Sequence, residues 1–279
     1  MLRAGGQDAY TAKMRDEVVT SIASDYLGLP VQRYRPVALY LNGEYWGIYF
    51  IREKLTDQYV AGNFGVEAEA VTLSNWTGGD CPKYKALQEY ARSHDLSQQK
   101  HYDYICSQIN MDNYIDYMIT QMWIANTDLG NVKFFRTDDM PWHWALFDTD
   151  LSFRRVSHTS VTIMMTRNIY KRDIRSATLL IRLMENKTFK EAFLKRTAWV
   201  VNNVWNAENV IQRIDEIQGV LEPDMKRECA RWGSSVDTWK KNVQSLRNFA
   251  SKRNEYFIAD VKSYFHLSDA QMRSYGFEV

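Results

Sequence analysis

An Asn-Gly pair between two apolar, aromatic-rich runs predicts a tight β-hairpin near the start of this chain. The first run extends from Val37 to Leu41, the pair is Asn42-Gly43, and the second run extends from Tyr45 to Ile51. Asn-Gly favours a two-residue β-turn because both residues tolerate positive φ angles at low cost. We therefore expect two antiparallel strands over residues 37–52.

Apolar residues elsewhere in the first half of the chain recur mostly at helical spacing. Spacings of three and four residues predict amphipathic helices over residues 11–27, 83–93 and 112–126. Met111-Asp112 offers a cap for the third of these helices.

A second hairpin and a run of helices follow. Val132–Arg136 and Trp142–Phe147 are strand candidates on either side of a turn, and helical spacing continues from about Ser176 almost to the end. Alternation along the second strand places Trp142 and Trp144 on one face, where we expect core packing rather than ligand stacking. Strands and helices are partly segregated along the chain, which indicates the α+β class.

The composition limits the size of the fold and the kinds of partner. With 279 residues, 45% of them hydrophobic, the chain can bury a core in one large domain or two lobes. Its 35 basic and 34 acidic residues give a formal net charge of +1, so we expect no nucleic-acid partner and no general attraction to membranes. No apolar run is long enough to span a bilayer, and the three cysteines form no metal-binding pattern.

Four oxygen-bearing side chains flank the second hairpin. Asp128 and Asn131 lie in the short loop before its first strand, and Asp148 and Asp150 follow its second strand. Because a hairpin brings its two ends together, we expect these four side chains to converge. Carboxylate and amide oxygens are ligands that Mg²⁺ accepts readily. In protein kinases the same order occurs: one Asp accepts the proton of the substrate hydroxyl, and an Asn and a second Asp hold metal ions.

The same residue types also have a purely structural use. Asp and Asn beside turns often cap helices or form turn hydrogen bonds. Spacing alone does not separate this use from a metal site, so both interpretations stay open at this point.

Three motifs, in order, resemble the CotH kinases, the atypical kinase family of spore coat protein H. They are the hairpin Asn42-Gly-Glu-Tyr-Trp-Gly47 leading to Glu53, the loop Asn126-x-Asp128-x-x-Asn131 followed by Phe-Phe-Arg, and Phe147-Asp-Thr-Asp150, with Phe147 where the family usually has Trp. Similar segments also occur before the first hairpin and near the C-terminus, namely Leu2-Arg3-Ala-Gly-Gly6, Arg15-Asp16 and Leu246-Arg-x-Phe249. The likeness therefore covers nearly the whole chain.

The resemblance implies an atypical protein-kinase-like fold in a single CotH kinase-like domain over residues 1–279. Residues 1–54 would be the remnant of a truncated N-terminal lobe, and residues 55–279 a largely helical C-terminal lobe. It implies transfer of the γ-phosphoryl group of ATP to Ser or Thr of a protein substrate, with Mg²⁺ or Mn²⁺. Asp128 would then be the catalytic carboxylate, and the metal would be held by Asn131, Asp148 and Asp150.

Two further binding roles are expected. Glu53 ends the first hairpin where a kinase hinge would lie, which places it beside the adenine, although it could equally pair with neighbouring Arg52 or Lys54. The basic stretch after the metal motif could hold an acidic or phosphorylated substrate, or could be a solvated loop; its candidate residues are Arg154, Arg155 and Arg167.

The chain departs from kinases in one respect. A kinase grips phosphates with a Lys on an early strand, and nothing before residue 11 supplies such strands. Gly5-Gly6 is expected to be an ordinary turn, and Glu17, which could pair with a missing Lys, is expected to be a solvated helix carboxylate. We therefore expect that upstream strands are absent from this chain or that the protein is inactive.

Three functions remain open on these grounds: an active kinase, an inactive kinase-like or scaffold protein of a surface or coat assembly, and another metal-dependent phosphotransferase or hydrolase. The resemblance favours an extracellular or cell-surface location, although no signal peptide is present in the sequence. The sequence predicts neither the identity of the protein substrate nor the oligomeric state.

Overall fold

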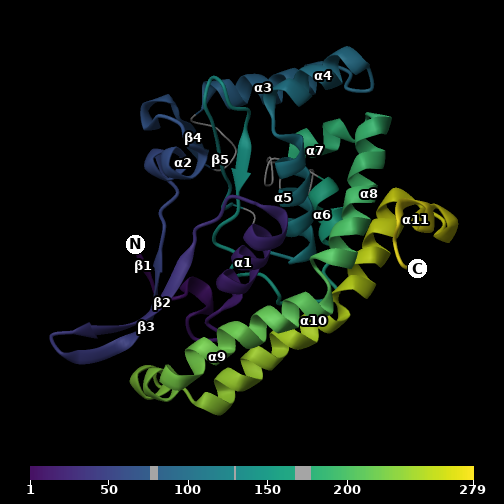
Figure 1. Cartoon of the computed structure of the whole chain (residues 1–279). Coiled ribbons are helices and arrows are strands. Elements are labelled where there is room, and N and C mark those ends of the chain that lie inside the picture. The colour runs from purple at the N-terminus through teal and green to yellow at the C-terminus, as the bar shows by residue number, and fades with distance from the viewer. Residues whose placement is uncertain (76–80, 129, 167–176) are drawn as a thin grey trace.

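Two small antiparallel sheets lie among helices, so the protein is of the α+β class, as predicted (Figure 1). The computed structural model describes residues 1–75, 81–128, 130–166 and 177–279. Within these residues, no helix is both long and apolar enough to cross a membrane. Both sheets come from the chain before Leu146, and the longest helices follow later.

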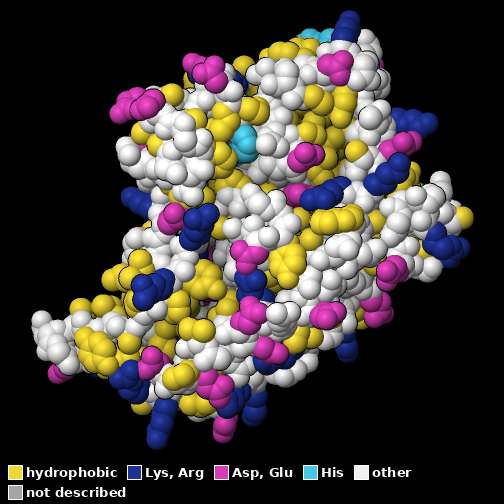
Figure 2. Space-filling model, in the orientation of Figure 1, with side chains coloured by type: hydrophobic (Ala, Val, Ile, Leu, Met, Phe, Trp, Pro, Cys, Tyr) yellow, Lys and Arg dark blue, Asp and Glu magenta, His cyan; other side chains and the backbone are white. Residues whose placement is uncertain are grey.

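The predicted first hairpin is present and forms most of the first sheet. Its strands are β2 (Tyr34–Leu41) and β3 (Glu44–Arg52), and β1 (Leu2–Arg3) pairs antiparallel with β3 on the other side. Asn42 and Gly43 have φ angles of 51° and 82°, as the two-residue turn requires. The turn end of the hairpin projects from the body of the molecule (Figure 1), and hydrophobic side chains gather along it (Figure 2).

Helix α1 (Arg15–Leu27) begins later than the predicted residue 11. The reason is the carboxylate of Asp8 in the 3-10 turn η1 (Gly6–Asp8), which accepts hydrogen bonds from the backbone N–H groups of Met14 and Arg15, each at 2.9 Å. These bonds satisfy donors at the helix start that have no partner inside the helix. The helix ends at Gly28, whose φ is 64°.

The predicted second hairpin forms the second sheet together with one further strand, in the order β4-β5-β6. Its strands are shorter than the sequence predicts. Helix α5 is capped by Asn110, whose side chain accepts a hydrogen bond from the backbone N–H of Asn113, so the cap expected at Met111-Asp112 is wrong. The elements of this part are α2 (Asp57–Phe64), η2 (Ala68–Ala70), β4 (Thr72–Asn75), α3 (Pro82–Ser93), α4 (Gln99–Gln108), α5 (Met111–Trp123), β5 (Lys133–Arg136) and β6 (His143–Ala145).

The rest of the chain is helical where the structure describes it, as predicted. Its elements are α6 (Ser160–Met165), α7 (Ala177–Leu183), α8 (Lys187–Asn203), α9 (Ala207–Trp232), α10 (Val236–Phe265) and α11 (Asp269–Tyr275). The two longest, α9 and α10, lie side by side along one edge of the molecule (Figure 1). Glu228 of α9 accepts a hydrogen bond from the backbone N–H of Ile48 at 2.7 Å and pairs with Lys13 at 2.7 Å, which links α9 to β3 and to the segment before α1.

One large hydrophobic core joins most of these elements. Trp142 and Trp144 are fully buried in it and pack against Tyr84 and Phe134, so their predicted role in the core is confirmed. The same core contains side chains from both sides of residue 54. The division into lobes at residues 1–54 and 55–279 therefore stays a prediction.

Candidate active site

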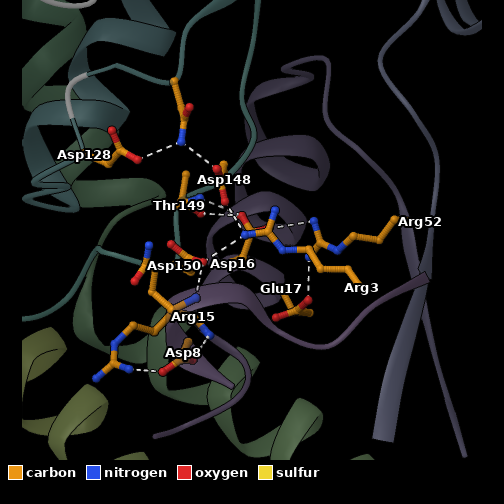
Figure 3. A network of polar contacts seen from close by, with 12 residues as sticks. Arg3, Asp8, Arg15, Asp16, Glu17, Arg52, Asp128, Asp148, Thr149 and Asp150 are labelled. Carbon is orange, nitrogen blue, oxygen red and sulfur yellow. Dashed lines mark hydrogen bonds and ion pairs between the residues drawn. The ribbon is translucent and has the colours of Figure 1, made fainter. Parts of the chain in front are cut away.

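Charged side chains from four separate segments meet that of Arg52, on strand β3 of the first sheet (Figure 3). The segments are β1 with the Gly5-Gly6 turn after it, the first turns of α1, the loop that contains Asp128, and the turn that contains Asp148.

The structure brings Asp128, Asn131 and Asp148 together at the base of the second hairpin. The side-chain amide nitrogen of Asn131 donates to Oδ2 of Asp128 at 2.7 Å and to Oδ2 of Asp148 at 2.5 Å. Both carboxylates therefore lie within hydrogen-bond distance of one atom. Asp148 has a φ of 55°, a conformation that is costly for residues with a side chain and tends to occur at functional sites.

Asp128 also stabilises its own loop. Its Oδ1 accepts a hydrogen bond from the backbone N–H of Gly130, and its own N–H donates to the side chain of Asn126, both at 3.0 Å. These are turn hydrogen bonds of the kind that Asp and Asn commonly form. The structural interpretation of this loop and the convergence of its carboxylate with Asp148 are thus both correct.

Arg3 of β1 lies between the two carboxylates of the metal motif. Its Nη2 donates to Asp148 and, at 2.9 Å, to Oδ2 of Asp150, which also accepts the backbone N–H of Gln7 at 2.8 Å. Burial raises the pKa of Asp150, and the negative charge of Asp148 adds to this. The hydrogen bond from the Gln7 N–H acts in the opposite direction. Gly6 has a φ of +58°, and a Cβ on it would lie 2.0 Å from Asp150, so only glycine fits this turn.

A second layer of charges lies behind the first. The Arg52 side chain, with no exposed surface, pairs with Asp16 at 2.8 Å and with Glu17 at 2.5 Å. Asp16 in turn accepts the backbone N–H and the hydroxyl of Thr149, at 2.9 and 2.7 Å. Glu17 is buried, so the expectation of a solvated carboxylate is wrong, and burial raises its pKa to about 7.

The sequence interpretation missed these partners. The sequence places Arg3 and Asp16 only in segments similar to the family, and it offers Arg52 only as a neighbour that could pair with Glu53. Arg3 and Asp148 are 145 residues apart in the chain, so no local spacing connects them. The signal that was present is the position of Arg3 two residues before Gly5 of the Gly5-Gly6 turn.

The donor chemistry of the site fits a hard divalent cation. Two guanidinium groups lie among five carboxylates, namely Arg3 and Arg52 among Asp16, Glu17, Asp128, Asp148 and Asp150. Such an excess of acidic oxygen atoms is suited to Mg²⁺ or Mn²⁺. Among the described residues, however, no three His, Cys, Asp or Glu side chains are arranged as a ready metal site. The contacts explain this, because the Arg3 guanidinium and the Asn131 amide nitrogen lie between the carboxylates.

A cavity of about 600 Å³ opens over this group. Its walls include Arg3, Gly6 and Gln7 on one side and all three of Asp128, Asp148 and Asp150 on the other. This volume is within the range of small-molecule sites, roughly 300–1,000 Å³. The cavity is open to solvent, so a ligand with a charged, hydrated part can enter it.

The other predicted site residues do not line this cavity. The Glu53 carboxylate accepts a hydrogen bond from the backbone N–H of Arg33 at 3.0 Å, and forms no ion pair with a cation of the described chain. Arg154 and Arg155 are exposed, and Arg154 lines a separate cavity. Arg167 lies outside the described residues.

The fold and the site together define an α+β protein with an acidic and amide cluster over an open cavity. The model of the CotH kinase protein family matches residues 1–257 of the chain. The protein therefore belongs to the CotH kinase family, as the three motifs indicated. A search of curated proteins gave no match. Membership of this family suggests a kinase-type function.

Proposed function

We propose that the protein is a kinase that transfers the γ-phosphoryl group of ATP to Ser or Thr of a protein substrate, with Mg²⁺ or Mn²⁺. The observation that carries this proposal is the convergence of Asp128 and Asp148, which both line one cavity and both accept from the Asn131 amide, in a chain of the CotH kinase family. A catalytic Asp followed by an Asn and a second Asp is the arrangement that phosphoryl transfer by kinases uses.

Each side chain has a proposed role. Asp128 accepts the proton of the attacking Ser or Thr hydroxyl, and it lines the cavity from which that hydroxyl would approach. The oxygen atoms of Asn131, Asp148 and Asp150 would hold the metal, whose contribution when bound is to neutralise charge on the phosphates. Asn131 would then turn its amide oxygen toward the metal and its nitrogen toward one carboxylate.

Arg3 is our candidate for the cation that grips the phosphates. Its side chain lines the cavity and is 18% exposed, whereas Arg52 has no exposed surface and cannot reach a ligand there. A guanidinium can donate two hydrogen bonds to phosphate oxygens. With Arg3 in this role, the site needs no Lys from a strand upstream of β1.

The ion pair between Arg52 and Glu17 supports the kinase-like character of the fold. In protein kinases a Lys on a strand pairs with a Glu on a neighbouring helix. Here Arg52 is on β3 and Glu17 is on α1, with 2.5 Å between their charged atoms. Contact of Glu53 with the adenine and an extracellular or cell-surface location remain predictions.

The test is phosphorylation by purified protein with γ-labelled ATP, Mg²⁺ or Mn²⁺, and a mixture of Ser- and Thr-containing peptides. We expect Asp148→Ala and Asp128→Ala to lower the rate by at least about 1000-fold. The matched control is Asp138→Ala, because Asp138 is exposed, pairs with Lys83 and is remote from the cavity. Label transfer by folded Asp148→Ala at the wild-type rate would contradict the proposal.

An inactive, kinase-like scaffold is the second candidate, and one observation favours it. The carboxylates already have partners within the protein, since Arg3 and Asn131 contact them. A thermal shift with ATP and metal, without label transfer to any peptide or to the protein itself, would identify this function. Release of free phosphate without labelled protein would instead identify a hydrolase.

A further inference from the structure

A second cavity, of about 430 Å³, lies beside the candidate active site and has a different chemical character. It is enclosed by the start of α1, the turn that follows Asp150, and one face of α10. Its lining residues are Thr11, Arg15, Phe153, Arg154, Val156, Ser245, Asn248, Phe249 and Lys252. Three of these side chains are cations and none is a carboxylate.

The apolar part of this cavity is rigid. The rings of Phe153 and Phe249 are stacked, with centroids 4.7 Å apart and planes 11° from parallel. Phe153 has a φ of 57°, and its backbone N–H donates to the carbonyl of Ile124 at 3.0 Å. A costly backbone conformation that is held by such contacts tends to position neighbouring side chains for function. The neighbour here is Arg154, four residues after Asp150.

Two of the three cations of the cavity have no counter-ion among the described residues, whereas the third, Arg15, pairs with Asp8. Arg154 and Lys252 are exposed, and neither forms an ion pair with a carboxylate of the described residues. Arg15 is buried and donates to Thr11 Oγ1 at 2.7 Å and to Asp8, while its Nε has no partner in the described part of the chain. Because the whole chain has a formal net charge of only +1, this concentration of cations is a local feature.

We propose that this cavity binds the phosphate group of a phosphoserine or phosphothreonine in the protein substrate. A phosphate monoester carries close to two negative charges and three acceptor oxygens, which suit the two exposed cations Arg154 and Lys252 together with the unpartnered Nε–H of Arg15. The apolar surface of Phe153, Val156 and Phe249 suits the carbon part of the residue that carries the phosphate. A free phosphate ion would leave that surface uncovered, and a carboxylate would bring only one charge.

The biological role inferred for this cavity rests on the proposed kinase function, whereas binding of the phosphopeptide can be tested without it. If the active site phosphorylates Ser or Thr, a phosphate-binding cavity next to it favours substrates that already carry a phosphorylated residue. The kinase would then act preferentially on segments it has begun to modify. Binding of a phosphopeptide can be measured in the protein whether or not phosphoryl transfer occurs.

The test is equilibrium binding of three fluorescein-labelled peptides of Ala and Gly, identical except for a central phosphoserine, serine or glutamate. We expect the phosphoserine peptide to bind at least about tenfold more tightly than the serine peptide, and the glutamate peptide to fall between them. The double substitution Arg154→Ala with Lys252→Ala should remove this preference. The matched control is Arg92→Ala with Lys241→Ala, which removes the same charge from exposed positions outside the cavity.

Three outcomes would overturn the inference. The first is equal binding of the phosphoserine and serine peptides. The second is an equal loss of the preference in the control variant, which would indicate general attraction of charge. The third is displacement of the labelled peptide by inorganic phosphate at the same concentration as by an unlabelled phosphopeptide, which would assign the cavity to the free ion. Asp148→Ala separates this inference from the proposed function. If that variant loses phosphoryl transfer but still prefers the phosphoserine peptide, both the proposed function and the inference are supported. If the wild-type protein prefers the phosphoserine peptide but transfers no phosphoryl group, only the proposed function is contradicted.

Discussion

Arg52 and Arg253 are both buried, yet the protein surrounds them in opposite ways. Arg52 faces two carboxylates, those of Asp16 and Glu17. The guanidinium of Arg253 on α10 donates to the backbone carbonyls of Met122, Trp123, Val156 and His158 and to the hydroxyl of Ser160, at 2.6 to 3.0 Å. One cation is held by charge, and the other by neutral acceptors.

The acid–base properties of the two side chains differ accordingly. Burial lowers the pKa of Arg253 to about 10, because the nearby Asp260 compensates for little of it. Burial acts on Arg52 in the same direction, but Asp16 and Glu17 outweigh it and raise the pKa of Arg52. Removal of the Arg52 charge therefore disturbs two carboxylates, whereas removal of the Arg253 charge leaves neutral hydrogen-bond acceptors without this donor.

The comparison shows which buried charge is structural and which belongs to the site. Arg253 joins the end of α5 to the segment before α6 by donating to carbonyls of the last helical turn. Arg52 belongs to a connected set of charges that reaches Asp148 through Asp16 and Thr149. Connected networks of buried charged groups, like the one around Arg52, are typical of functional sites.

The largest expected effect on stability is that of Arg253→Met. The substitution keeps much of the side-chain volume but leaves five acceptors without this donor, three of them buried, which costs about 3–5 kcal/mol. Because the groups that accept from Arg253 are backbone carbonyls and a hydroxyl, the loss should change little between pH 5.5 and pH 8. The His158 imidazole, whose pKa burial and then Arg253 lower, should make the loss only slightly smaller at pH 5.5. Urea unfolding at both values measures it, and Arg247→Met on the same helix, at a half-exposed pair with Asp215, is the control.

The next effect is that of Arg52→Met, and here pH should matter. Without Arg52, the buried carboxylates of Asp16 and Glu17 lose their cation, and Glu17, whose pKa burial already raises, becomes neutral as pH falls. We expect a loss of about 2–4 kcal/mol at pH 8 and a clearly smaller loss at pH 5.5. Equal losses at both values would show that Arg52 and Arg253 are the same kind of structural cation.

The features that the sequence predicted correctly depend on neighbours in the chain. The Asn42-Gly43 turn, the second hairpin and the convergence of Asp128 with Asp148 all follow from local turn chemistry. The start of α1 was wrong because its cap is Asp8, which reaches it from a turn six residues before Met14. Helix α4 (Gln99–Gln108) was missed because its sequence is largely polar.

The charged interior could not be predicted from spacing. Apolar positions on α1 indicated one buried face, and Glu17 therefore looked solvent-exposed. In the structure every residue from Arg15 to Thr20 is buried, because β3 contributes Arg52 on one side and the turn around Thr149 packs on the other. Which side chains meet there depends on the pairing of distant segments, such as β1 with β3.

A smaller effect is expected from Glu17→Gln. Burial, followed by repulsion from Asp16, raises the pKa of Glu17 to about 7 against the attraction of Arg52. A raised folded-state pKa contributes stability below the unfolded value, and that contribution is lost as pH rises through about 7. Gln imitates the protonated acid, so the variant should be more stable than wild type at pH 8, by up to about 3 kcal/mol, and nearly equal to it at pH 4.5. Lower stability of the variant at pH 8 would mean that attraction to Arg52 outweighs burial.

The smallest expected effect is that of Arg3→Ala on ligand binding. This effect distinguishes Arg3 from the buried Arg52 and Arg253. Arg3 lies between Asp148 and Asp150, where its charge competes with any metal that these carboxylates hold. The proposed roles therefore predict opposite changes: Mn²⁺ alone should bind a few-fold more tightly to the variant, and ATP in the presence of Mg²⁺ a few-fold more weakly. Calorimetric titration of each ligand measures both changes, with Arg33→Ala as a control on an exposed residue that lines no part of the cavity. If both affinities fell together, Arg3 would be a structural cation like Arg253, held in place to shape the site rather than to exchange partners within it.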